Sequence, residues 1–192
     1  MEIRKFISKL NWRLMLIQLL ATLFLILGAR KLAMLSDIGI LEAFTYYDGS
    51  SDVLTKLVPN ELSTGDRMMY YILSKFYAGV IAALIAFAIS LTISIKNRIF
   101  WLNSFFVIIL TIAISRLHFF DLYAVKTISS VAGELFWSFG LHAVYLINAI
   151  LLITIGFFIF FNPWTKKFIR KQYPEEHFAP KKLPEKEEWV WD

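Results

Sequence analysis

Four long apolar runs constrain the fold of this sequence more than any other feature. A helix needs about 20 mostly apolar residues to cross a hydrocarbon layer about 30 Å thick. The runs that reach this length lie at about 14–35, 69–95, 99–117 and 135–161. We therefore predict an all-α integral membrane protein, a four-helix transmembrane bundle of up-down topology.

The composition agrees with a membrane protein and excludes several chemistries. Hydrophobic residues make up 58% of the chain and charged residues only 18%, whereas a soluble domain has about 25% charged residues. The chain has no cysteine, which excludes disulfides, thiolate metal sites and cysteine nucleophiles. Its net charge of +5 comes largely from basic residues beside the apolar runs, so we expect no nucleic-acid partner.

The basic residues also predict how the chain is oriented. Lys and Arg concentrate in segments 1–13 and 163–192 and in the short turn between the second and third runs. Because short cytoplasmic segments are enriched in Lys and Arg, we predict that both termini are cytoplasmic, in a bacterial inner membrane. The domains are then the cytoplasmic N-terminal segment 1–13, the transmembrane domain 14–162 with its external loop 36–67, and the basic cytoplasmic tail 163–192.

The external loop is predicted to be partly helical and to cover the outer mouth of the bundle. Residues 38–41 read Ile-Gly-Ile-Leu, an apolar stretch that can lie on the membrane or on the bundle. Near the end of the loop, Ser63 and Asp66 have the spacing of a capping box. This spacing predicts that the second helix begins there.

Cationic residues gather at one depth of the predicted bundle. Counting from the cytoplasmic side at about 1.5 Å per residue places four of them near the outer interface. They are Arg30, Lys31, Lys75 and Arg116. Because Arg and Lys bind phosphate oxygens, these residues are our candidates for an anion or lipid-headgroup site. The alternative is that each side chain extends to the lipid headgroups without forming a site.

The fourth apolar run carries a polar stripe. Its members follow one another at intervals of four, four, three and three residues, which keeps them on one helical face. They are Glu134, Ser138, His142, Tyr145 and Asn148. We expect this stripe to point into the bundle, where it either contributes to a site or joins helices through hydrogen bonds of about 1 kcal/mol or less each.

Four titratable residues near the outer interface could carry chemistry. They are His118, Asp121, Glu134 and His142. Three roles are open to them: acid–base catalysis on a lipid or quinone, a divalent metal site of mixed nitrogen and oxygen ligands, and haem ligation by His118 with His142. No cofactor is the preferred expectation. The sequence also contains no phosphate-binding loop, nucleophile elbow or zinc-protease motif.

The first predicted helix has a characteristic beginning and end. Arg13 opens it, and Gly28, Lys31 and Leu32 form a G-x-x-K-L pattern that closes it. These features, together with the short turn after the second run and with His118 at the end of the third, resemble the DoxX-like family of small membrane proteins. The resemblance implies a four-helix membrane fold.

Three functions are considered. The leading hypothesis is an accessory or scaffolding subunit of a membrane complex, whose partners are membrane lipids and either other membrane protein subunits or further copies of the chain. The second is an enzyme or redox subunit that acts on a lipid or quinone through the four titratable residues. The third is an oligomeric channel or transporter, which we disfavour because we expect no repeated small-residue seam in any span.

Overall fold

The computed structural model describes residues 10–46, 64–97, 99, 101–116, 131 and 133–165, with only the backbone of 43–46, 64, 115 and 116. All regular structure in these ranges is helical. The elements are α2 (Trp12–Met34), α3 (Ile38–Tyr46), α5 (Thr64–Lys96), α6 (Leu102–Arg116), the short 3-10 helix η2 (Trp137–Phe139) and α8 (Leu141–Phe161).

Three of these helices, α2, α5 and α8, are long and apolar enough to cross a membrane. The prediction of an all-helical membrane protein is confirmed to this extent. The third predicted span corresponds to α6, which has 15 residues, and residues 117–130 lie outside the described ranges. The number of four spans and the cytoplasmic termini therefore stay predictions.

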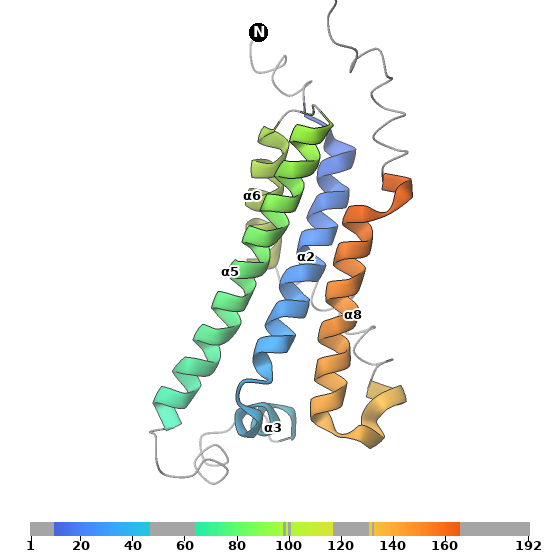
Figure 1. Ribbon diagram of the computed structural model, residues 1–192. Helices are drawn as coiled ribbons and strands as arrows, with labels where there is room; N and C mark the ends of the chain where they lie inside the picture. The colour runs from blue at the N-terminus through green and yellow to red at the C-terminus, as the bar shows by residue number, and fades with distance from the viewer. Residues whose placement is uncertain are drawn as a thin grey trace, which may run out of the picture.

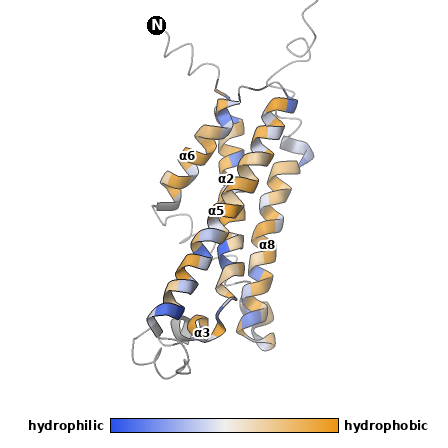
Figure 2. Ribbon diagram, turned by 60° about the vertical axis from the view of Figure 1, so that its left-hand side comes forward, coloured by the Kyte–Doolittle hydropathy of each residue, from blue (hydrophilic) through white to orange (hydrophobic). Residues whose placement is uncertain are grey.

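Helix α2 is the centre of the bundle and packs against α8, α5 and α6. Figure 1 shows it between α5 and α8. In its most apolar window 67% of the residues are buried, against 28% in α5 and 33% in α8. Apolar residues occupy most of the length of all these helices (Figure 2). The outward faces of α5 and α8 are apolar, as is required of helices that contact lipid chains.

Small residues bring α2 and α8 close together. A Cβ atom added to Gly28 would lie 2.9 Å from the carbonyl oxygen of Ala149, and one added to Gly156 would lie 3.0 Å from that of Ala21. The two helices are therefore antiparallel, with a glycine of each against an alanine of the other. The expectation that no span carries a small-residue seam is wrong for this pair.

Asparagine side chains join the helices at the end of the bundle opposite α3. The Asn11 carboxamide oxygen caps α2 by accepting the Leu14 N–H at 3.1 Å. The Asn11 N–H in turn donates to the side-chain oxygen of Asn103, on α6, at 3.2 Å. Nearby, the Ser90 hydroxyl of α5 donates to that of Ser104 at 2.9 Å. These bonds fix the starts of α2 and α6 beside the last turns of α5.

Two helix boundaries follow from local residue types. α5 begins at Thr64, within the predicted capping box, and its 33 residues span about 50 Å at 1.5 Å per residue. α8 begins at Leu141 rather than near residue 135, which corrects the fourth predicted span. The reason is Gly140, whose φ of +89° is not helical and is a conformation that glycine readily adopts.

Candidate anion site at the α3 end

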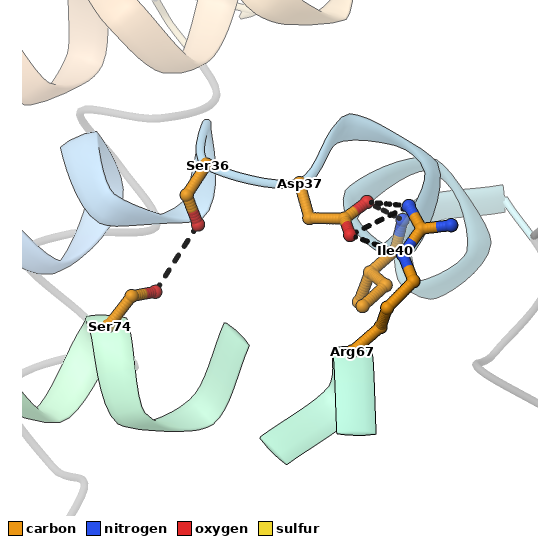
Figure 3. Close-up of polar contacts among 5 residues, drawn as sticks. All are labelled: Ser36, Asp37, Ile40, Arg67 and Ser74. Carbon is orange, nitrogen blue, oxygen red and sulfur yellow. Dashed lines mark hydrogen bonds and ion pairs between the residues drawn. The ribbon is translucent and has the colours of Figure 1, made fainter. Parts of the chain in front are cut away.

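One carboxylate, that of Asp37, connects the helices at the α3 end of the bundle. Asp37, between α2 and α3, accepts the Ile40 N–H at 3.2 Å and so caps the first turn of α3. Its two oxygens also accept hydrogen bonds of 2.7–2.9 Å from the guanidinium of Arg67, in the first turns of α5. One residue earlier, the Ser36 hydroxyl lies 3.2 Å from that of Ser74 (Figure 3). α3 is therefore anchored to both α2 and α5.

A cavity of about 260 Å³ lies beside these contacts. Its walls come from four helices, α2, α3, α5 and α8. They consist of Met34, Leu41, Met68, Tyr71, Ile72, Lys75 and Tyr145. The surface is thus mainly apolar, with one ammonium group and two phenol rings.

The structure describes the side chains of three of the four predicted cationic residues, and of these only Lys75 lines the cavity itself. The Lys75 ammonium lies 5.3 Å from the centre of the Tyr71 ring, and the Lys31 ammonium lies 5.0 Å from the centre of the Tyr145 ring. Both distances are typical of cation–π contacts. Arg30 crosses to α5 at Gly79, where an added Cβ would lie 2.9 Å from Nε of Arg30. The side chain of Arg116 lies outside the described part of the chain.

Arg67 is a fourth cation near α3, but it forms an ion pair with the Asp37 carboxylate, with an N···O distance of 2.7 Å. Two other acidic residues, Glu42 and Asp66, lie on the nearby α3 and α5, but neither lines the cavity. An apolar wall with cations at its margin favours an anionic amphiphile over a neutral or cationic ligand.

The predicted polar stripe is interrupted. Tyr145 lines the cavity, and Asn148 is buried in α8. Glu134, Ser138 and His142 are exposed. Glu134 and Ser138 precede the break at Gly140, whereas His142 lies in the first turn of α8. The structure therefore adds Tyr145 to the cationic site and leaves the exposed members of the stripe outside the cavity.

The predicted acid–base and metal constellation is not assembled in the described ranges. No group of three or more His, Asp or Glu side chains lies together among those residues. His118 and Asp121 are outside them. Glu134 and His142 are exposed and line no part of the cavity. The hypotheses that need His118, including haem ligation, stay predictions.

Reasoning from sequence missed Tyr71 and Gly79 but predicted Lys75, which lies between them on α5. Tyr71, Lys75 and Gly79 follow one another at intervals of four, so they share one face of α5. That spacing was a usable signal. The ion pair of Asp37 could not be predicted from a local spacing, because its partner Arg67 is 30 residues away in the sequence.

Comparisons with known proteins assign no family to this chain. No family model, curated protein or solved structure matches it. The resemblance to the DoxX-like family therefore stays a prediction. What the protein does has to be inferred from the chemistry of the cavity at the α3 end.

Proposed function

We propose that the chain is a small polytopic membrane protein that holds the headgroup of an anionic lipid at the α3 end of its bundle. We further propose that it serves as an accessory or scaffolding subunit of a bacterial inner-membrane complex. The distribution of Lys and Arg along the chain supports placing the α3 end at the outer face.

One observation carries the proposal: Lys75 lines a largely apolar cavity, and Lys31, from another helix, lies on the ring of Tyr145, which belongs to the wall of the same cavity. Arg30 and Lys31 come from α2, and Lys75 comes from α5. Cations that only extend separately to lipid headgroups have no reason to lie on two rings of one cavity wall. Here the Lys31 and Lys75 ammonium groups each lie against a ring that forms part of the cavity wall.

The apolar wall supports a lipid rather than a free inorganic anion. Met34, Leu41, Met68 and Ile72 offer no hydrogen bonds. They suit the glycerol backbone and the first carbons of the acyl chains, whereas the ammonium and guanidinium groups suit phosphate oxygens. Free phosphate would leave these apolar side chains without a matching surface.

The test is lipid binding by the purified protein in a neutral detergent. Native mass spectrometry would be used to titrate phosphatidylglycerol against phosphatidylcholine with the same acyl chains. Preferential binding of phosphatidylglycerol is expected. Because a hydrogen bond to a charged group contributes about 1.5–3 kcal/mol, the triple variant Arg30→Ala, Lys31→Ala, Lys75→Ala should lose about tenfold or more in affinity.

A matched control is Lys96→Ala, which removes an exposed cation at the last turn of α5, far from α3. It should bind phosphatidylglycerol as the unmodified chain does. Equal binding of the two lipids, or equal losses in the triple variant and the control, would contradict a headgroup site.

The accessory role needs a separate test at native expression. A tagged chain should co-purify in a complex of fixed stoichiometry, and native mass spectrometry of that complex should give its composition. A chain recovered alone, as a single monodisperse species, would contradict the accessory role without bearing on lipid binding.

A further inference from the structure

We infer that the cavity at the α3 end is filled from within the bilayer, through an opening between α5 and α8 beside Ile72. Its ligand is therefore an amphiphile that keeps its chains in the membrane while its headgroup is bound. This inference rests on the proposed function, because it concerns how the same lipid reaches and occupies the same cavity.

Helix α3 closes the end of the cavity. Ile40 and Leu41 of α3 are buried. Ile40 packs against Tyr71 of α5, and Leu41 belongs to the cavity wall. The ion pair between Asp37 and Arg67 holds this helix against α5. A ligand that arrived from water at the α3 end would have to displace a packed helix.

The side of the cavity between α5 and α8 is open. Far from α3, Ala86 of α5 and Phe160 of α8 belong to one buried cluster. From there α5 leans away from α8 toward the α3 end (Figure 1). Of the wall residues that the structure describes, Ile72 alone is exposed, at 50%, whereas Leu41 and Tyr71 are buried. The opening therefore lies beside Ile72.

The opening lies at the level of lipid headgroups. Ile72 is 24 residues before Lys96, the last residue of α5, which corresponds to about 36 Å along the helix axis. A hydrocarbon layer is about 30 Å thick. With Lys96 at one boundary of this layer, Ile72 lies just beyond the other boundary. A lipid beside α5 thus has its headgroup and glycerol at the height of the opening.

The volume of the cavity also requires an opening. A site that encloses a drug-sized ligand has a volume of about 300–1,000 Å³. The cavity of about 260 Å³ is smaller. It can accommodate a headgroup with its glycerol, but not the acyl chains of the same lipid as well. The chains of a bound lipid must therefore leave through the opening.

An apolar stripe on α5 continues from the opening along the helix. Phe76 and Val80 follow Ile72 at intervals of four residues, so the three lie on one face. All three side chains are exposed. The stripe extends the cavity wall by about 12 Å along α5. An acyl chain that leaves the cavity beside Ile72 can contact apolar side chains along this length, which favours a membrane lipid over a free anion.

The test measures how fast the bound lipid exchanges. The protein is loaded with phosphatidylglycerol in a neutral detergent and mixed with deuterated phosphatidylglycerol, and native mass spectrometry follows the replacement with time. Ile72→Ala and Ile72→Trp change the size of the side chain at the opening. Ile109→Ala and Ile109→Trp are the matched controls. They alter an exposed isoleucine of α6, a helix that contributes none of the described wall residues.

The expected result is a dependence of the exchange rate on the size of residue 72. Ile72→Trp should exchange about tenfold more slowly than the unmodified chain, because the larger ring narrows the opening. Ile72→Ala should exchange several-fold faster, and both Ile109 variants should exchange at the unmodified rate. Should Ile72→Trp prevent loading, the comparison of Ile72→Ala with Ile109→Ala decides the question.

Two outcomes would overturn the inference and leave the headgroup site standing. One is equal exchange in the Ile72 variants and the corresponding Ile109 variants. The other is faster exchange in Arg67→Ala with no dependence on residue 72, which would show that the lipid enters past α3. If the unmodified chain does not prefer phosphatidylglycerol to phosphatidylcholine, the proposed function itself fails.

Discussion

The carboxylate of Asp37 both caps α3 and receives the guanidinium of Arg67, with the shortest contact at 2.7 Å. A single side chain thus controls the start of one helix and its attachment to another. Both partners are partly exposed, at 18% for Asp37 and 23% for Arg67. The cap and the ion pair can be separated by substitution, because the cap needs only an acceptor whereas the ion pair needs a charge.

We predict a graded loss of stability at this junction. Asp37→Ala removes both cap and ion pair and should lower the free energy of unfolding by about 1–3 kcal/mol. Asp37→Asn and Arg67→Ala each keep a cap and lose the ion pair, so they should cost about 1 kcal/mol or less. Unfolding in detergent, followed by circular dichroism, measures the series. Equal losses in Asp37→Ala and Asp37→Asn would show that the cap contributes nothing.

We also predict that the Asp37–Arg67 pair keeps α3 closed over the cavity. Leu41 of α3 is 1% exposed and lines the cavity. Because the chain has no cysteine, Leu41→Cys would supply a unique thiol. A water-soluble maleimide should label it slowly, and several-fold faster when Arg67→Ala is added.

The control for this labelling is Gly65→Cys, at an exposed position in the first turn of α5. Its labelling rate should be high and insensitive to Arg67→Ala. If Leu41→Cys is labelled at the same rate with and without the ion pair, other contacts hold α3 in place.

The seam between α2 and α8 gives a prediction about packing. A methyl group at Gly28 would meet the Ala149 carbonyl oxygen at 2.9 Å, and a backbone atom cannot move aside cheaply. Gly28→Ala and Gly156→Ala should therefore each destabilise the protein by about 1–3 kcal/mol. Gly133→Ala is the matched control, since no atom lies within 4 Å of the added methyl group. Thermal unfolding in detergent measures these losses of stability. An equal loss in Gly133→Ala and in the other two variants would refute close packing at the seam.

The membrane helices and the level of the cations along them could be predicted from the sequence for a physical reason. Burying about 20 apolar residues in succession leaves little choice besides a membrane helix. Counting along such helices also predicted that Arg30, Lys31 and Lys75 lie at one level. In the structure Lys75 lies on the Tyr71 ring, Lys31 on the Tyr145 ring and Arg30 against Gly79.

Other features could not be read in this way, because they depend on which helices are neighbours. Ala21 and Gly28, and likewise Ala149 and Gly156, are seven residues apart. This spacing forms a seam only if α2 packs antiparallel on α8. The break at Gly140 is a different case, since glycine permits a positive φ without requiring it.

The last prediction concerns the place where Arg30 lies on α5. A methyl group at Gly79 would come within 2.9 Å of Nε of Arg30, and the other close atoms are also from this side chain. Arg30 can move away at little cost, and alanine is favoured over glycine in a helix by about 1 kcal/mol. Gly79→Ala should therefore leave thermal stability nearly unchanged but displace the guanidinium of Arg30 from its position on α5. We expect its affinity for phosphatidylglycerol to fall to that of Arg30→Ala, and the double variant to lose no more than either single one. Additive losses would mean that Gly79 affects lipid binding by a route other than the position of Arg30.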